Sequence, residues 1–252
     1  LNISYQNNFD VLSSPLKFRV SANVSNFKGI ITKYNNPNGL LSSYYEGQRL
    51  GEIWGYRIAG QFQSDEEAAA YQSTFTNPST SLGRVYGDVF NVVQNSEWNY
   101  LRGGDVIYID LNGDGKIDNG ENTLDNHGDL ERIGNATPRF PFGVNLSASW
   151  KSLDFSIALS GIARQDWYPT GELYWGTYQR PYLSFLRKDL IDNAWTPDNK
   201  ENTYPQIYRG YSSLQSNRSL YQINDYYLTN VGFIRAKNLT VGYSLPQEMT
   251  RK

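Results

Sequence analysis

The sequence has 252 residues, enough for one large β domain or two smaller ones, and its net charge of −2 provides no broad basic surface for nucleic acid. It contains no Cys, which excludes disulfides, thiolate metal sites and cysteine nucleophiles. No apolar run of about 18 residues occurs, so a transmembrane helix is excluded; a transmembrane barrel is not, because its strands turn only every second residue toward lipid.

Alternating apolar and polar residues predict the first two strands. Ile3 and Tyr5 stand among polar neighbours and predict one strand. A clearer alternation runs through residues 16–24, with apolar side chains at even positions and polar side chains at odd ones. We therefore expect a half-buried or lipid-facing strand there.

The residues from about 27 to 140 form a first long connection. Ser64 stands three residues before Glu67, which is the spacing of a helix-capping box, and predicts a short helix through Tyr71. Residues 106–109 form a strand-like apolar run. Such a connection is far longer than compact domains usually carry, so it is expected to form a loop region with its own structure.

An acidic segment after that run has the spacing of a calcium-binding loop. Short oxygen side chains alternate, a Gly permits the sharp turn, and one ligand is a backbone carbonyl. Hard oxygen ligands suit calcium better than a transition metal, and the alternative is a metal-free acidic turn. The predicted ligands of a structural calcium ion are Asp110, Asn112, Asp114, the Lys116 carbonyl, Asp118 and Glu121.

A second acidic alternation follows, at Asp125, His127, Asp129 and Glu131. Its residues imitate a metal cluster, but solvated acidic side chains explain the pattern better. His127 is the single histidine of the chain, and no carboxylate pair stands in an apolar setting that would raise one pKa. The sequence therefore offers no catalytic set, and we expect a protein that is not an enzyme.

The alternation returns in the second half of the chain. It runs through residues 144–150, resumes at Leu153 after only Lys151 and Ser152, and predicts an antiparallel hairpin. A last alternating stretch, residues 239–245, stops at Pro246. About five strands are predicted in all, each close to the 9 to 11 residues that cross a bilayer.

A second long connection joins residues 164 to 231. Leu183, Leu186, Leu190 and Ala194 have helical spacing and predict a short packing helix. Aromatic side chains of the two connections can stack on sugar rings or form an interface, since both uses need a rigid apolar face with a polar edge. Trp54, Tyr174 and Trp175 are the candidates for substrate contact, with Trp167 as a further aromatic of the connections.

Short turns at one end and long loops at the other are typical of an outer-membrane barrel. A soluble sandwich gives the same alternation, with the apolar face in a core. In a barrel the alternate apolar residues of each strand face lipid, and Trp150 is expected to lie near an interfacial aromatic girdle. The residues predicted on the lipid-facing side of one sheet are Leu146, Trp150, Phe155, Ile157 and Val241.

Several short sequence segments resemble those of SusC/RagA-type, TonB-linked outer-membrane proteins. They occur in the right order over nearly the whole chain, at residues 45–51, 54–56, 60–64, 104–110, 133–134, 138–140, 225–228 and 233–243. The resemblance implies a barrel of the 22-stranded type, plugged by an N-terminal domain. Residues 1–252 are accordingly expected to be a partial β-barrel domain, without the plug domain or the TonB box, and no signal peptide begins at Leu1.

The resemblance also implies a function. Such proteins import glycans or oligopeptides across the outer membrane of Gram-negative bacteria, and it suggests a source in Bacteroidota. A SusD-like surface lipoprotein would deliver the substrate, the TonB complex would supply energy, and outer-membrane lipid would surround the barrel. The rival hypothesis is an extracellular, calcium-stabilised carbohydrate-binding or adhesive β module.

Overall fold

The structure is a computed structural model that describes residues 1–74, 101–176, 187–206, 222–246 and 249. The chain divides into two compact units. The sheet unit consists of Leu1–Gly29, Ala136–Asp166 and Asn230–Lys252, and the loop unit consists of Ile30–Asn135 and Trp167–Thr229. Leu183 and Leu186, which belong to the helix predicted in the second connection, lie outside the described residues.

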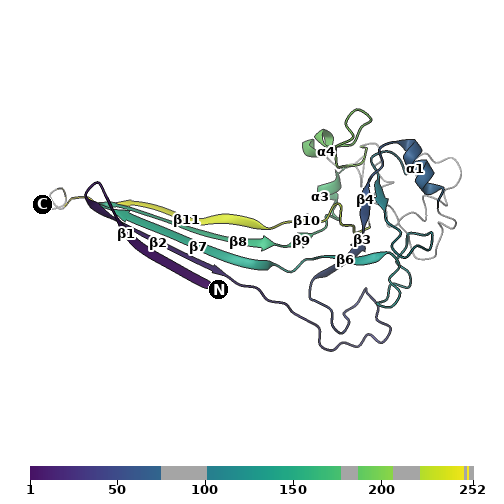
Figure 1. Cartoon of the computed structure of the whole chain (residues 1–252), viewed down its shortest axis with the longest axis horizontal. Helices are drawn as coiled ribbons and strands as arrows, with labels where there is room; N and C mark the ends of the chain where they lie inside the picture. Colours follow the sequence, from purple (N-terminus) through teal and green to yellow (C-terminus); the bar gives the residue numbers. More distant parts are fainter. Residues whose placement is uncertain (75–100, 177–186, 207–221, 247–248, 250–252) are drawn as a thin grey trace. The chain divides into compact units, whose positions relative to one another are not determined.

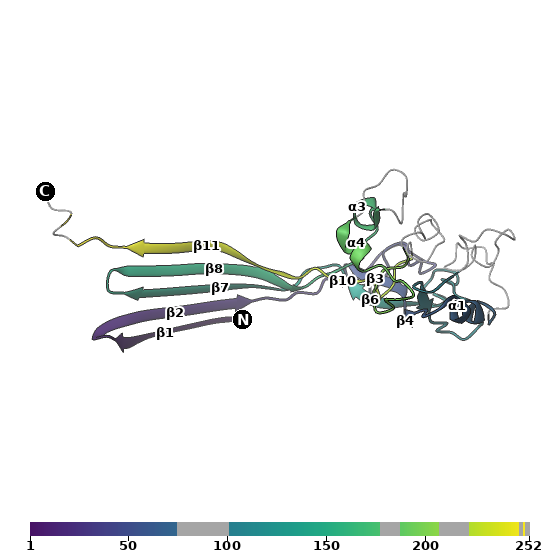
Figure 2. The same ribbon diagram turned by 90° about the horizontal axis from the view of Figure 1, so that it is seen from above.

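The sheet unit is one antiparallel sheet of five long strands, in the order β1-β2-β7-β8-β11 (Figures 1 and 2). All the predicted strands are present, and their lengths of 10 to 12 residues match the prediction. The all-β fold class is therefore confirmed. The strands are β1 (Asn2–Val11), β2 (Ser14–Val24), β7 (Arg139–Trp150), β8 (Leu153–Arg164) and β11 (Phe233–Tyr243).

Two-residue turns close the two hairpins of this sheet. Leu12 and Ser13 join β1 to β2 with φ of 47° and 58°, in the left-handed region that type I′ turns require. Lys151, with φ of 54°, begins the turn from β7 to β8. The hairpin predicted at Lys151 and Ser152 is confirmed.

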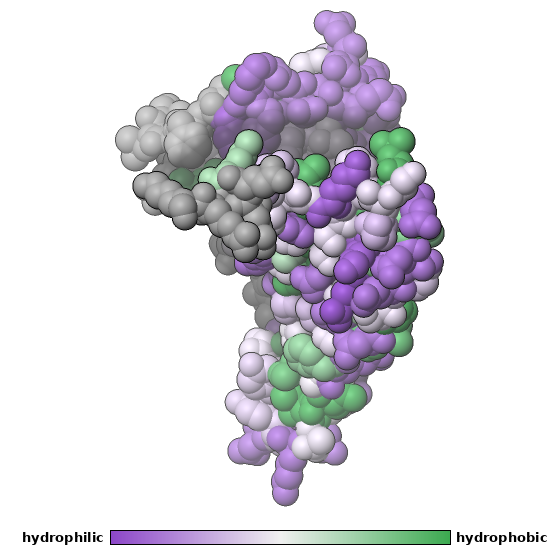
Figure 3. Space-filling view, turned by 90° about the vertical axis from the view of Figure 1, so that its left-hand side faces the viewer, coloured by the Kyte–Doolittle hydropathy of each residue, from purple (hydrophilic) through white to green (hydrophobic). Residues whose placement is uncertain are grey.

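Strand register sorts the sheet into an apolar face and a polar face. Leu146 of β7 pairs with Val20 of β2 and Ile157 of β8, and Val241 of β11 pairs with Phe155. Residues paired across antiparallel strands share a face, so the side chains of the predicted lipid-facing set lie on one side of the sheet. Val241 is 71% exposed and Phe155 42% exposed. Figure 3 looks onto the turn end of this unit and shows apolar residues, in green, at its surface.

The loop unit contains short strands and helices. Strand β3 (Glu52–Tyr56) pairs with β6 (Leu130–Asn135), and β4 (Ile58–Gln61) pairs with β5 (Val106–Tyr108). A third pair consists of β9 (Asp166–Trp167) and β10 (Thr229–Asn230). Asp166 and Asn230 belong to the sheet unit, and Trp167 and Thr229 belong to the loop unit. The helices are α1 (Asp65–Gln72), α3 (Glu172–Trp175) and α4 (Lys188–Asp192).

Helix α1 confirms the predicted capping box. Ser64 Oγ accepts a hydrogen bond from Glu67 N at 3.2 Å, and Glu67 Oε2 in turn accepts one from Gln63 N at 2.6 Å. The first bond satisfies a backbone donor that a helix start would otherwise leave unpaired, and the second ties the helix to the residue before its N-cap. In α4, Leu190 is fully buried, as its place in the predicted apolar stripe requires.

All the buried apolar side chains of the described residues belong to the loop unit. The two long connections build one core together: Tyr56, Phe62 and Tyr108 come from the first, and Trp175 and Leu190 from the second. Large rings pack edge to face, with Tyr56 and Tyr108 centred 5.4 Å apart. The connections are therefore a folded body rather than open loops.

Polar contacts also join the two connections. Arg57 donates to Glu131 at 2.6 Å and to Asp225 at 3.0 Å, while Asp225 accepts a further bond from Ile58 N. Gln61 donates from Nε2 to the carbonyl oxygens of Gly104 and Thr203. These bonds fix Asp225 and Thr203 against β4 and the Arg57 that precedes it.

The backbones of the two long connections approach each other closely at Gly55. A Cβ there would lie 2.5 Å from Ile133 Cδ1 and 2.6 Å from the Ile223 carbonyl oxygen, closer than real atoms come. Only glycine therefore lets Tyr56 N reach Ile223 O, at 2.8 Å. Within the described residues, no helix has the length and apolar character needed to cross a membrane.

Candidate functional site

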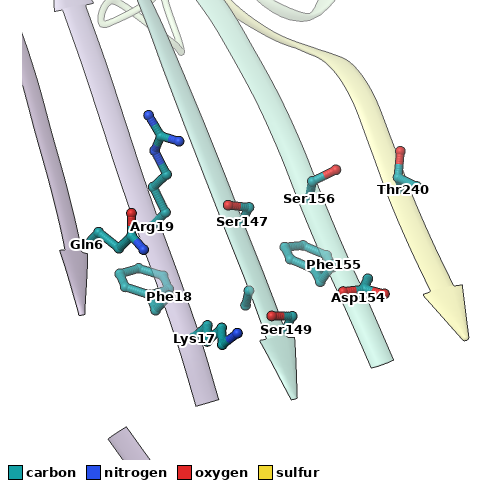
Figure 4. A pocket seen from close by; sticks show the side chains of 11 residues that line it. Gln6, Lys17, Phe18, Arg19, Ser147, Ser149, Asp154, Phe155, Ser156 and Thr240 are labelled. Atoms are coloured by element: carbon teal, nitrogen blue, oxygen red, sulfur yellow. The ribbon is translucent and has the colours of Figure 1, made fainter. Parts of the chain in front are cut away.

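The polar face of the sheet unit carries a row of side chains across all five strands. Register places Gln6 opposite Arg19, Arg19 opposite Ser147, Ser147 opposite Ser156, and Ser156 opposite Thr240. Figure 4 shows this row together with Lys17, Ser149 and Asp154 of the next one. The side chains line a hollow of about 380 Å³.

This face has charge and hydroxyl groups but no enclosed pocket. Lys17 and Arg19 supply positive charge, and Asp154 supplies negative charge on the same side as Lys17. Such a surface suits water and polar solutes, as in the lumen of a barrel. Sequence reasoning assigned this parity to the lumen without naming its residues as a site, although the alternation itself identified them.

The predicted calcium loop is curled around its own backbone. Asp110 accepts bonds from Gly113 N at 2.7 Å and Gly115 N at 2.9 Å, one on each carboxylate oxygen. Asn112, Asp114 and Asp118 accept bonds from the amides of Asp114, Lys116 and Gly120 in the same way. Gly113 and Gly115 have φ of 74° and 76°, which permits the curl.

These contacts bear on whether the loop suits calcium. The side chains are oxygen donors of the hard kind, and each carboxylate oxygen keeps lone pairs beyond its backbone bond. Across the described parts of the chain, no three acidic or histidine side chains converge closely enough to hold a metal ion. Asn112 and the Lys116 carbonyl add oxygens of other kinds, while Glu121 lies at the exposed end. The donor set fits calcium in kind, and calcium binding stays a prediction.

Asp129 organises this loop from outside it. The residue is 1% exposed, and its carboxylate accepts bonds from Leu111 N and Asp118 N, both at 2.8 Å, with a longer one from Asn112 N. Burial raises the pKa of Asp129 to about 6, the charge of the Asp110 carboxylate adds to that rise, and the three backbone donors partly oppose it. From the sequence alone, Asp129 was expected to be one of several solvated acidic side chains.

The neighbours of Asp129 have other roles. Glu131 pairs with Arg57, and this bond lowers the pKa of the Glu131 carboxyl. Asp125 is exposed, and His127 lies beside Trp54 with ring centroids 5.4 Å apart. The four alternating residues therefore do not form one site in the described structure.

The aromatic candidates differ in exposure. Trp175 is fully buried, and its Nε1 donates to the Pro169 carbonyl at 2.7 Å. A ring enclosed on all sides has no face left for a sugar, so Trp175 is a core residue in this structure and not a stacking platform. Tyr174 is half-buried under the Arg187 guanidinium, 4.6 Å from its ring centroid, and its hydroxyl lies 3.1 Å from that of Tyr204.

Trp54 is the candidate that borders open space. Its ring is half-buried, and it lines a cleft of about 330 Å³ in the loop unit. Its Nε1 donates to Glu52 Oε1 at 2.9 Å and to Tyr45 Oη at 3.2 Å. Arg132 lies over the ring, 5.2 Å from the centroid.

Comparison with known proteins places this geometry in context. No family model matches the chain. TonB-dependent receptor P39 of Formosa agariphila is 28% identical over 220 residues, which cover 82% of this chain and 20% of that protein. The chain is similar to a segment of a TonB-dependent receptor. TonB-dependent receptor P3 of the same organism is 24% identical over 211 residues, again 82% of this chain, and 16% of its own length is matched.

The fold of this chain is also similar to part of a solved structure. The structure of the RagAB peptide importer in its open-open state matches 99% of this chain and 22% of the solved one, with a TM-score of 0.52 and 20% identity. The predicted resemblance to SusC/RagA-like proteins is thereby confirmed. The chain spans about a fifth or less of the length of the curated receptors that it matches. Both curated relatives are named as receptors rather than as enzymes.

Proposed function

We propose that this chain is part of an outer-membrane, TonB-dependent import protein and has no enzymatic role. The observation that carries the proposal is the division of the five-stranded sheet into an uncovered apolar face and a polar face. Lipid on one side and water on the other would satisfy both faces. A membrane setting also explains why the described part of the sheet unit buries no large apolar side chain.

The turn end of the sheet suits a membrane interface. Trp150 and Tyr243 both pair with Leu153, so two amphipathic rings share one row of the apolar face. Trp150 donates from Nε1 to the Val11 carbonyl at 3.1 Å, and Lys151 lies 4.5 Å from its ring centroid. Such rings are favoured at the headgroup level, where one edge is wet.

The rival hypothesis, a soluble carbohydrate-binding or adhesive module, requires a different environment. It would enclose Val144, Leu146 and Trp150 in a packed core. In the sheet unit, these side chains belong to a face whose described members are half-buried or exposed. The transporter hypothesis therefore agrees better with the observed burial.

Partners and substrate follow from the proposal. The similarity to a RagAB peptide importer and to TonB-dependent receptors supports a surface lipoprotein partner of the SusD-like kind and energy from the TonB complex. Imported material would be glycans or oligopeptides. The location would be the outer membrane of a Gram-negative bacterium related to Formosa, within Bacteroidota.

Uptake should depend on TonB. In a strain that lacks the protein carrying this chain, we expect slower uptake of one class of labelled glycan or oligopeptide. Disabling the TonB complex in the parent strain should reduce the same uptake to the same extent. Growth on a simple sugar that enters through general porins serves as the control. If loss of this protein slows uptake equally in strains with and without a working TonB complex, the proposal is contradicted.

The two ends of the sheet should lie on opposite sides of the membrane. The loops that hold Trp54 and Trp175 are expected outside, and Lys151 and Ser152 in the periplasm. Residues 1–252 contain no Cys, and Leu173 is 77% exposed, so Leu173→Cys and Ser152→Cys each add one thiol whose labelling is measured against the unmutated protein. An impermeant thiol reagent on intact cells should label position 173 and should reach position 152 only after the outer membrane is permeabilised. Labelling at 152 alone would reverse this topology.

Calcium should stabilise the loop unit through residues 110–121. Four carboxylates in twelve residues repel one another, and a divalent ion would relieve that repulsion. A calcium concentration about 100 times the Kd would add about 2.7 kcal/mol. Melting measured in calcium and in chelator should show this gain in the native protein, and Asp114→Ala should lose it. The exposed Asp198→Ala is the matched control. Equal melting temperatures of the native protein in both buffers would reject the calcium site.

A further inference from the structure

The loop unit contains a cleft whose lining residues are all uncharged. Its walls come from both long connections, and the polar groups among them are hydroxyls and carboxamides. The lining residues are Trp54, Tyr56, Asn119, Leu130, Thr170, Gln222 and Ile223. At about 330 Å³, the cleft is at the small end of ligand pockets, which suits a single ring rather than a long chain.

One wall of this Trp54 cleft is a held aromatic ring. The indole Nε1 has two acceptors, Glu52 Oε1 and Tyr45 Oη, and the Arg132 guanidinium lies over the ring. These contacts fix the orientation of the ring before any ligand arrives. A fixed platform loses little conformational freedom on binding, so it is well suited to stacking.

Backbone bonds fix another part of the cleft lining, Tyr56 with Gln222 and Ile223. Tyr56 N donates to Ile223 O at 2.8 Å, and Asp225 N donates to Tyr56 O at 3.1 Å. Tyr168 Oη donates to the Gln222 carbonyl oxygen at 2.9 Å, which holds the segment that follows the cleft. The cleft therefore has a defined shape built from parts far apart in the sequence.

Asn119 has a polar side chain that the protein does not use. Its Oδ1 is buried and accepts no hydrogen bond from the described residues. Buried polar atoms normally have a partner, because burial without one is costly. Asn119 also lines the cleft. Asn119 is therefore free to bond a ligand.

We propose that the Trp54 cleft binds one neutral sugar ring. A pyranose offers an apolar C–H face to Trp54 and hydroxyl groups to Asn119 and Thr170, with Leu130 and Ile223 as further apolar contacts. A charged ligand would lose its hydration without meeting an opposite charge in the lining. This inference deepens the proposed function. Binding of the sugar does not depend on that function; only the import of the bound sugar rests on it.

Binding can be measured on the purified full-length protein in detergent, without transport. The probes are the methyl glycosides of glucose, galactose and mannose, with N-acetyl-leucinamide as a neutral peptide-like probe, followed by saturation-transfer NMR and calorimetry. At least one glycoside should bind to the native protein. Trp54→Leu and Asn119→Leu should each raise its Kd about tenfold.

Asn119→Leu separates a ligand role from a structural one. Because Asn119 Oδ1 has no partner in the described chain, replacing it with an apolar group of similar size should leave the melting temperature unchanged or raise it. Trp167→Leu is the matched control for the aromatic change, since Trp167 is 43% exposed in the same unit and does not line the cleft; it should bind like the native protein.

Two results would overturn the inference. One is that none of the three glycosides binds, or that N-acetyl-leucinamide binds in their place. The other is that a bound glycoside keeps its Kd in both Trp54→Leu and Asn119→Leu. Either result leaves TonB-dependent uptake untouched, whereas glycoside binding without any TonB-dependent uptake would refute the proposed function alone.

Discussion

Leu146→Arg should destabilise the protein folded in a bilayer by about 2–4 kcal/mol, the cost of a charged side chain at the lipid midplane. Leu146 lies well inside β7 and pairs with Val20 and Ile157 on the apolar face. Urea titration of the full-length protein folded in lipid vesicles, followed by tryptophan fluorescence, measures the change.

The neighbouring residue provides the control. Asn145 pairs with Ser21 and Ala158 on the polar face, so Asn145→Arg would place the same charge in water and change the folding free energy by less than about 1 kcal/mol. If the two variants are equally stable, or if Asn145→Arg is the weaker one, the assignment of lipid to the apolar face is wrong.

Asp129→Ala should destabilise the acidic loop by about 3 kcal/mol. The substitution removes the charged acceptor of the Leu111, Asn112 and Asp118 amides, and a hydrogen bond to a charged group contributes about 1.5–3 kcal/mol. Part of that loss is offset, because burial already disfavours the ionised carboxyl. Hydrogen exchange measured amide by amide should show faster exchange at these three positions.

Two further variants sharpen this test. Asp129→Asn keeps one acceptor oxygen and should retain part of the protection. Asp125→Ala removes an exposed acid of the same segment and should leave exchange at Leu111 and Asp118 unchanged. Faster exchange in both Asp129→Ala and Asp125→Ala would point to general charge effects instead of the specific bonds that Asp129 accepts.

The sheet could be predicted from the sequence because residues close together in the chain specify its strands and turns. Alternation along residues 16–24 or 144–150 already states which side chains share a face, and the two residues between β7 and β8 fix a hairpin. The capping box before α1 is local in the same sense. Each of these predictions needed only a short window of sequence.

The loop unit could not be predicted in this way. Arg57 and Asp225 are 168 positions apart, and no periodicity links them. Burial of Trp175 and Asp129 depends on contacts with segments that the sequence does not mark as partners. The residue types of the acidic loop predict oxygen ligands for calcium, which stays a prediction. They did not reveal that a buried carboxylate outside the loop, Asp129, holds it in place.

The shared core of the two connections has a consequence for the order of folding. Its members from the first connection, such as Tyr56 and Phe62, are synthesised long before Tyr227 of the second, and β7 and β8 lie between them in the chain. Contacts with such large sequence separation close long loops and slow the folding of a domain. The loop unit should therefore complete its core late, after the central hairpin of the sheet has been made, and a nascent chain that ends before Tyr227 would leave the aromatic side chains of the first connection exposed to aggregation.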